Sequence, residues 1–195
     1  MYAMEELEAA IDAVKDIGLP VCATMSFDTA GKTMMGITPS NLAKRSQDLN
    51  LIGFGANCGI GAPDLLATIN DISKSVDPGT VVISKANCGI PEFVDGSIIY
   101  SGTEELMSEY VKIAMNSGAK IIGGCCGTTF DHVRAMRKAM DEHIVTSAPT
   151  LEEIEEKVGA MSEGSRLIFK GDDSKPTKQR SCLLYTSPSP RDHQP

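Results

Sequence analysis

The stretch AKIIGGCCGTT, residues 119–129, joins a short apolar run to two adjacent cysteines framed by glycines. The run predicts a buried strand, and the glycines after it let the backbone turn sharply. Consecutive Cα atoms lie about 3.8 Å apart, whereas a relaxed disulfide needs roughly 4.4–6.8 Å, so Cys125 and Cys126 are badly placed to bridge each other. Two thiolates at the end of a strand instead favour the binding of one soft metal ion.

A five-residue sequence upstream of this stretch occurs twice. ANCGI at residues 56–60 returns at residues 86–90, an offset of 30 residues that is about the length of one βαβ unit. Each copy directly follows an apolar run, as Cys125 does. The three cysteine-bearing segments therefore occupy equivalent places, just past the ends of strands.

Apolar runs alternate along the chain with segments whose apolar residues recur at helical spacing. Strands are predicted at residues 19–27, 51–56, 81–85 and 120–123. Helices are predicted at residues 4–16, 39–49, 62–76, 101–117 and 129–143. Alternating strands and helices indicate an α/β fold with a parallel sheet.

The number of strands bears on the architecture. Chemistry in a (β/α)8 TIM barrel gathers at the C-terminal ends of eight strands, and the full barrel takes about 250 residues. Four βα units are half of that number. The sequence therefore predicts the C-terminal half of a (β/α)8 TIM barrel, with parallel strands and with Met1 as an internal residue of a longer parent.

Three segments follow from this interpretation. Residues 1–145 are the partial barrel, and residues 146–169 are a C-terminal helix and linker in which Thr150 and Glu153 have the spacing of a capping box. Residues 170–195 are predicted to be a disordered tail. Within it, residues 182–192 resemble a translated sequencing adapter and are excluded from the fold, together with Cys182.

The charge, the apolar segments and the cysteine content indicate which kinds of partner the protein has. The formal net charge of −8 disfavours nucleic acid, and no segment has the pattern of a signal peptide or a membrane span. Six cysteines in 195 residues are too sparse for a secreted disulfide scaffold. The expected protein is cytoplasmic and acts on small molecules, and its oligomeric state is left open.

Cys58, Cys125 and Cys126 are the candidate metal ligands, and zinc (Zn2+) is the expected ion. Catalytic zinc keeps three protein ligands and an open fourth position, into which a substrate thiol could enter and ionise. A thiolate is the nucleophile that attacks an activated methyl group. The protein would then mainly align the reacting atoms, and no side chain is assigned a catalytic role.

Four neighbouring residues have alternative interpretations. Cys22 and Cys88 are interpreted as small buried side chains, which is what free cysteines usually are, although the role of Cys88 stays open. Asn57 and Asn87 could bind substrate or simply hydrogen-bond a turn, and they are the weak candidates for substrate binding.

Two motifs together carry a family resemblance. GANC at residues 55–58 and GGCCGTT at residues 123–129 resemble the zinc-binding signature of the homocysteine S-methyltransferase family, and PVCATMSFD at residues 20–28 and NCGIPE at residues 87–92 are similar to its strands. The resemblance covers about residues 1–140, and the wording is most similar to that of bacterial betaine–homocysteine methyltransferases.

The resemblance implies a function for the parent protein. Cys58, Cys125 and Cys126 would hold zinc, homocysteine would be the methyl acceptor, betaine the donor and methionine the product. The family's acidic homocysteine-binding residue would precede Met1 and is absent, so the fragment itself is expected to be inactive.

Three alternatives stay open. The chain could be the homocysteine module of a methionine synthase that depends on cobalamin and methyltetrahydrofolate. It could also be a non-functional truncated fragment that binds metal loosely and aggregates. In a third interpretation, the cysteines form a redox switch and bind no metal.

Overall fold

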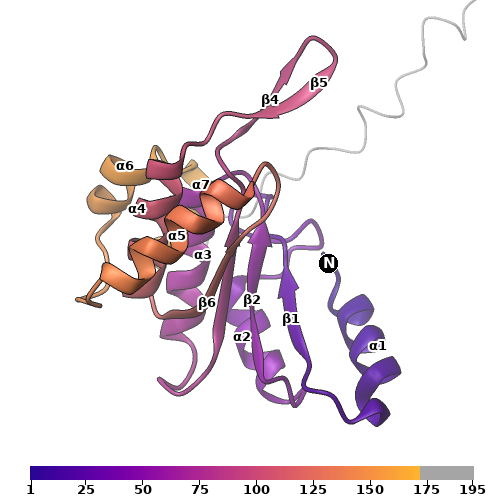
Figure 1. Ribbon diagram of the computed structural model, residues 1–195. Coiled ribbons are helices and arrows are strands. Elements are labelled where there is room, and N and C mark those ends of the chain that lie inside the picture. The colour runs from indigo at the N-terminus through magenta and orange to yellow at the C-terminus, as the bar shows by residue number, and fades with distance from the viewer. Residues whose placement is uncertain (172–195) are drawn as a thin grey trace, which may run out of the picture.

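The computed structural model describes residues 1–171. A four-stranded parallel sheet, in the order β1-β2-β3-β6, forms its centre (Figure 1). The strands are β1 (Cys22–Met25), β2 (Gly53–Cys58), β3 (Val82–Ala86) and β6 (Ala119–Gly124). The predicted adapter-like segment, and the predicted tail apart from its first two residues, lie outside the described residues.

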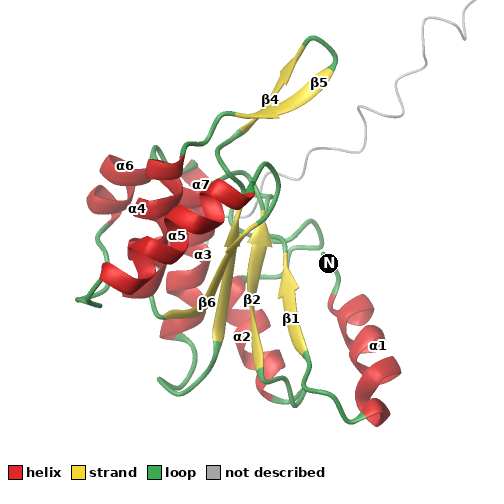
Figure 2. Cartoon of the chain, viewed as in Figure 1, coloured by secondary structure: helices red, strands yellow, loops and turns green. Residues whose placement is uncertain are grey.

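Helices alternate with these strands along the chain (Figure 2). They are α1 (Met4–Val14), α2 (Pro39–Gln47), α3 (Ala62–Lys74), α4 (Glu104–Asn116), α5 (Phe130–Glu142), α6 (Leu151–Val158) and α7 (Glu163–Phe169), with a 3-10 turn η1 (Lys15–Ile17) after α1. The predicted α/β class with a parallel sheet is confirmed. Within residues 1–171, none of the helices combines the length and the apolar composition that crossing a bilayer requires.

Local sequence explains where several helices begin. The side chains of Thr38, Thr103 and Thr150 each accept a hydrogen bond from the backbone N–H three residues later, which satisfies a group that a helix start leaves unpaired. At the start of α5 the backbone N–H of Thr129 donates to Nδ1 of His132. These contacts place the helices close to their predicted boundaries.

The core lies between the sheet and its helices. Alternation along β3 points Ser84 toward the helices, where its hydroxyl lies 2.7 Å from the hydroxyl of the fully buried Tyr110 in α4. Large apolar side chains of α2, α3 and α4 belong to the same core; among the fully buried ones are Leu42, Leu66, Ile69, Met107 and Ile113. The helices therefore cover one face of the sheet.

The opposite face of the sheet is more open. Lys85 and Gly123 are paired on this face, and Ile121 of β6 is 44% exposed there. Cys22 is exposed as well, so its prediction as a small buried side chain is wrong. Alternation explains the error, because Ala23 and Met25 point into the core while Cys22 points the other way from an edge strand.

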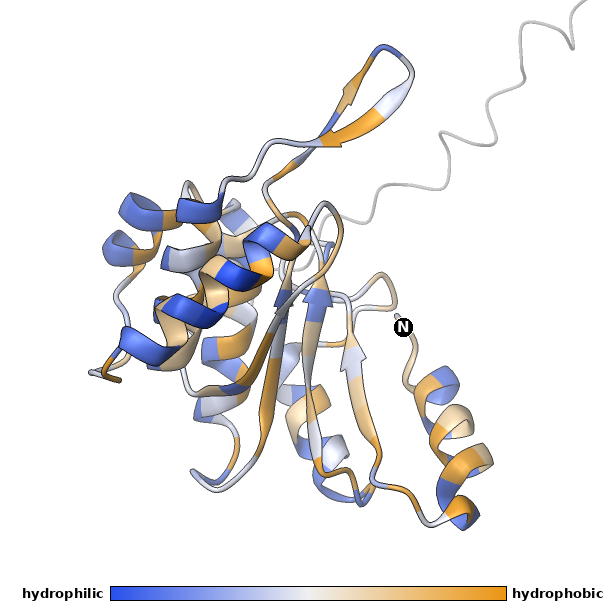
Figure 3. Cartoon of the chain, viewed as in Figure 1, coloured by the Kyte–Doolittle hydropathy of each residue, from blue (hydrophilic) through white to orange (hydrophobic). Residues whose placement is uncertain are grey.

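A β-hairpin that the sequence pattern did not predict follows β3. Strands β4 (Pro91–Val94) and β5 (Ser97–Tyr100) pair antiparallel and project away from the central sheet (Figure 1). Asp95 and Gly96 make the turn, and both have positive φ, as the mirror-image hairpin turns require. Both strands of the hairpin carry apolar residues (Figure 3). Phe93 and Ile98 are paired across the hairpin, and their side chains are 77% and 64% exposed.

The C-terminal helices pack onto α3. Ser162 caps the first turn of α7 and also donates its hydroxyl to the buried carboxylate of Asp64 at the start of α3. Glu155 of α6 accepts hydrogen bonds from the backbone of Met161 and from Arg166. The sequence indicated only one helix in this region, so α7 is an addition to the prediction.

Candidate metal centre

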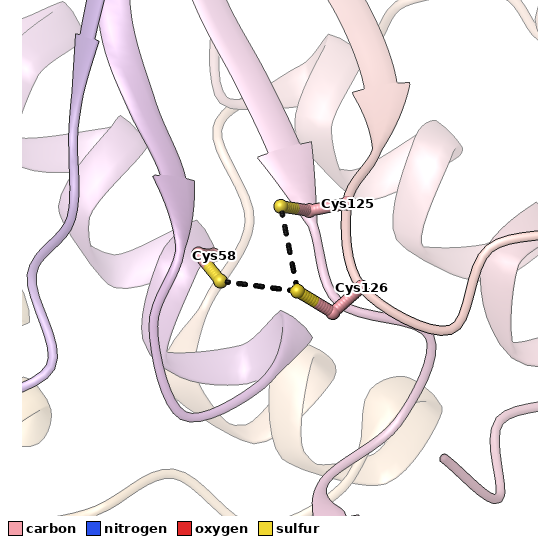
Figure 4. A group of neighbouring side chains, drawn as sticks. All are labelled: Cys58, Cys125 and Cys126. Atoms are coloured by element: carbon pink, nitrogen blue, oxygen red, sulfur yellow. Dashed lines mark hydrogen bonds between the residues drawn. The ribbon is translucent and has the colours of Figure 1, made fainter. Parts of the chain in front are cut away.

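Three cysteine sulfurs meet at the C-terminal edge of the sheet (Figure 4). The Sγ of Cys126 lies 3.6 Å from that of Cys58 and 4.0 Å from that of Cys125, and all three lie within 4.8 Å of one another. The sheet register accounts for this meeting, because Cys58, Ala86 and Gly124 lie side by side on β2, β3 and β6.

The backbone of Cys58 turns its thiol into the group. Continued strand alternation would send this side chain to the helix-covered face, with Ala56. Instead, Cys58 has φ of 61° and Gly59 has φ of 78°, so the strand ends in two left-handed residues. This conformation costs a non-glycine residue about 1–2 kcal/mol, and here it directs the sulfur toward Cys126.

Backbone hydrogen bonds join the cysteine pair to the end of β3 and to the loop that follows it. The backbone carbonyl of Ala86 accepts a hydrogen bond of 2.6 Å from the N–H of Cys125. The N–H of Cys88 donates to the carbonyl of Cys126 at 2.9 Å. The side chain of Cys88 is fully buried and is not one of the three grouped thiols, as its interpretation as a small buried residue requires.

The two asparagines of the repeat have different environments. Asn87 is buried, and its side-chain NH2 donates to the carbonyl of Gly59 at 2.8 Å while its Oδ1 accepts from the N–H of Cys126 at 3.2 Å. It therefore links the loop after β2 to the loop after β6. Asn57 is less buried and donates to the hydroxyl of Ser26 at 3.3 Å.

The pKa values of Cys58 and Cys126 are shifted in opposite directions. Burial, followed by hydrogen bonds with Cys126 and Cys125, raises the pKa of Cys58 to about 11. Hydrogen bonds from Tyr100 and then from Cys58 lower the pKa of Cys126. In the metal-free chain Cys126 therefore ionises before Cys58.

Two tyrosines near this group were not among the predicted site residues. Tyr100, at the end of β5, is the first cause of the lowered pKa of Cys126. Tyr2 lies against Asp28, whose negative charge raises the pKa of Tyr2. Neither tyrosine belongs to a recognisable motif, and only the missed hairpin brings Tyr100 to the sheet edge.

The sulfur separations suit a zinc ion. Two sulfurs that each lie about 2.3 Å from a tetrahedral zinc are about 3.8 Å apart, and the two short Sγ separations fall on either side of that value. Thiolates are the soft donors that zinc accepts. Three such donors leave one tetrahedral position for a further ligand.

Comparison with known families decides the relationship. The family model described as homocysteine S-methyltransferase matches residues 1–140. The chain belongs to the homocysteine S-methyltransferase family. The resemblance that the cysteine motifs carry is thus confirmed.

A curated member of this family is similar to the chain. Betaine–homocysteine S-methyltransferase 1 of Rattus norvegicus is 28% identical over 152 residues, which cover 70% of this chain. The chain spans only 37% of the length of that rat protein. The homocysteine S-methyltransferase match includes all three grouped cysteines, Asn87 and Tyr100, and it ends within α5.

Proposed function

We propose that this chain carries the zinc-binding part of a homocysteine S-methyltransferase that uses betaine as the methyl donor. The grouping of Cys58, Cys125 and Cys126 carries the proposal, since these three residues offer a soft, three-ligand site. Family membership supports homocysteine as acceptor, and the similarity to the rat enzyme supports betaine as donor.

The proposed chemistry is a single displacement. Zinc held by the three cysteines would supply the positive charge that keeps a substrate thiol ionised at neutral pH. The homocysteine sulfur attacks a methyl carbon of betaine, the carbon–nitrogen bond breaks, and its electron pair leaves with the nitrogen. The products are methionine and dimethylglycine.

The chain's own residues fix the geometry of the site. The carbonyl of Ala86 and the amide of Asn87 hold the backbone of Cys125 and Cys126. Asn87 also holds Gly59 beside Cys58, so the loops that carry the sulfurs share one support. Such prior alignment is the main contribution a protein can make to a direct methyl transfer.

We further propose that the sheet is the C-terminal half of a (β/α)8 barrel. The parallel order β1-β2-β3-β6, with helices packed on one face, fits four consecutive βα units. The 37% coverage of the rat protein agrees with a catalytic unit that has further strands. The more open face, with Ile121 and Cys22, would then line the barrel interior.

The expected surroundings are those of a small-molecule enzyme. The five cysteines within residues 1–171 are all free thiols. Free thiols suit a reducing compartment, so we place the parent enzyme in the cytoplasm. Homocysteine and the methyl donor are its expected partners.

Metal stoichiometry tests the proposal. The purified full chain should bind about one zinc per molecule, and Cys126→Ser should abolish this binding because a catalytic zinc site needs all three protein ligands. Cys22→Ser is the matched control, since Cys22 is exposed and lies outside the group.

Two further measurements accompany the stoichiometry. Thiol titration separates the metal site from a redox switch, because a metal-free chain whose grouped thiols oxidise reversibly would contradict the zinc proposal. Methionine formation from betaine and homocysteine tests whether the fragment has activity of its own. Cooperative unfolding together with methyl transfer would show that this half is functional alone.

A further inference from the structure

A lysine lies on the open face of the sheet, near the C-terminal end of β3. Ser84 and Ala86 are fully buried against the helices, so alternation directs Lys85 to the opposite face. A Cβ added to Gly123, its partner on β6, would lie 3.5 Å from the Cγ of Lys85. The stem of Lys85 therefore lies on the open face, beside a glycine that leaves room for it.

The ammonium group of Lys85 has no counter-ion in the described part of the chain. The residue is only partly exposed, and none of the ion pairs within residues 1–171 includes it. Lys120, the other lysine of the central sheet, donates instead to the carbonyl of Pro78 at 2.7 Å. A partly buried ammonium without a protein carboxylate beside it is free to bind an anionic ligand.

Polar neighbours extend the site across the sheet. The register pairs Lys85 with Asn57 on β2, and the side-chain NH2 of Asn57 donates to the hydroxyl of Ser26 at 3.3 Å. This bond uses one N–H of the amide, and the second has no partner within residues 1–171. Neighbouring strands lie about 4.8 Å apart, so the ammonium and the amide present donors side by side.

This row of donors lies next to the metal centre. Asn57 directly precedes Cys58, and Gly123, the partner of Lys85, lies two residues before Cys125. Each strand residue advances about 3.3 Å, so the row is a short step from the sulfurs along the strands. A small substrate that reaches the metal centre with its sulfur or methyl group can therefore place a carboxylate at this row.

We propose that Lys85 binds the carboxylate of a substrate at the metal centre, with Asn57 as a second donor. The proposal rests on the proposed function, in which homocysteine and betaine both carry a carboxylate. A hydrogen bond between an ammonium and a carboxylate is stronger than one between neutral groups, so it fixes the orientation of the substrate. Lys85 thereby selects substrates that carry an acid group over analogues without one.

Binding of homocysteine to the cobalt-loaded full chain tests the methyl acceptor. The absorption of the cobalt ion changes when the thiolate of the ligand enters its coordination shell, so no activity is needed. Lys85→Met should bind homocysteine about tenfold more weakly. It should bind homocysteamine, which is homocysteine without its carboxylate, with unchanged affinity. Lys85→Arg keeps a cation and should retain most of the affinity for homocysteine.

Calorimetry with betaine and choline tests the methyl donor. Choline carries an alcohol where betaine carries its carboxylate, so the two ligands differ only in the group that Lys85 is proposed to bind. A loss of affinity for homocysteine alone assigns Lys85 to the acceptor, and a loss for betaine alone assigns it to the donor. Either result supports the proposal.

A second lysine provides the control. Lys120→Met removes the same charge near the opposite end of β6 and should change none of these affinities. The proposal is overturned if Lys85→Met weakens ligands with and without a carboxylate equally, or weakens none. It is also overturned if the original chain binds the acids no better than their analogues.

Titration of the metal-free chain keeps this proposal separate from the proposed function. The same four ligands are titrated by calorimetry into the original chain and into Lys85→Met without any metal. If the original chain binds neither zinc nor cobalt, the proposed function fails, and the comparison of acids with their analogues still decides the role of Lys85.

Discussion

Asn87 connects two segments that are distant in the sequence. Its amide satisfies the carbonyl of Gly59 and the N–H of Cys126, and it is almost completely buried. Asn57 occupies the same position of the repeated sequence and donates a hydrogen bond to the side chain of Ser26. The two residues form a natural matched pair, because their local sequences are the same and their contacts differ.

We expect Asn87→Ala to lower the free energy of unfolding by about 1–3 kcal/mol, since it removes two partly buried hydrogen bonds that each contribute about 0.5–1.5 kcal/mol. Zinc affinity should fall with it, because the loops of Cys58 and Cys126 lose their shared support. Urea unfolding and metal titration measure the two effects. Asn57→Ala should have the smaller effect on both, and the reverse order would contradict the assigned role of Asn87.

The acidities of the thiols predict an order of modification. With its lowered pKa and exposed position, Cys126 should react with iodoacetamide before Cys58, whose pKa is raised to about 11. Raising the pH toward 11 should narrow the difference, as the Cys58 thiol ionises. Mass spectrometry of peptides alkylated between pH 7 and 11 gives both rates, and faster reaction of Cys58 near pH 8 would refute the order.

The same pKa has a consequence for stability. The Cys58 thiol has a higher pKa in the fold than a free cysteine, so folding favours its neutral form. Its contribution to stability is therefore complete below about pH 8.5 and is lost as the pH rises toward 11. Cys58→Ser should remove this part of the pH dependence in the metal-free chain.

Single residues show what the sequence could and could not predict about the site. Adjacent cysteines between glycines are unusual enough to indicate a metal site. The repeat offers Cys58 and Cys88 alike, and the family resemblance favours Cys58. The environments of Asn57 and Asn87 could not be distinguished, because five-residue sequences that are alike carry no information on long-range partners. Tyr100 could not be found at all, since its position depends on an element that was not predicted.

At the scale of elements, the base of the hairpin is fixed by a close approach of Gly102 to Cys88. An added Cβ at Gly102 would lie 2.5–2.7 Å from the carbonyl group and the sulfur of Cys88. The backbone of Gly102 also bonds to that carbonyl. The position of β5, and of Tyr100 with it, depends on this close approach.

We therefore expect Gly102→Ala to destabilise the chain by about 1–3 kcal/mol, as overpacked cores do, and to weaken zinc binding. Gly79→Ala is the control, because nothing lies within 4 Å of an added Cβ there, and it should change stability by less than about 0.5 kcal/mol. Thermal unfolding and metal titration measure both variants. A neutral Gly102→Ala would show that the hairpin base is not held by this contact.

Elements with local signals were the easiest to predict. Helices α2, α4 and α6 begin after threonines that cap them, and Gly18, with φ of 75°, ends the turn after α1. The hairpin was missed although Asp95-Gly96 is a strong turn signal, because its strands are short and lie between the predicted strand at residues 81–85 and the predicted helix at residues 101–117. Strand ends were less accurate, since pairing with neighbours decides them.

At the scale of the whole molecule, helices cover one face of the sheet much more completely than the other. Helices bury one face, while Ile121 and Cys22 are exposed on the other. The outer edges of β1 and β6 have no paired strand within residues 1–171. Exposed edges and apolar faces of this kind promote association between chains.

Ile121→Lys tests this property. The substitution places a charge on the open face and should reduce self-association in sedimentation velocity, with little change in the free energy of unfolding. Val133→Lys is the comparison, because Val133 is also exposed but belongs to α5 on the helical side. If the original chain is monomeric at high concentration, the open face does not drive association.

The register of β2, β3 and β6 has a consequence for folding kinetics. Cys58 and Cys126 are 68 residues apart in sequence, and β3 must be in place between their strands before the sulfurs can meet. Contacts between segments so far apart in sequence form late in folding, because the chain loses much conformational entropy before these contacts can stabilise it. The absorbance of a thiolate-bound metal during refolding would therefore report when the sheet is complete. Slow release of the metal would mean that the strands separate slowly.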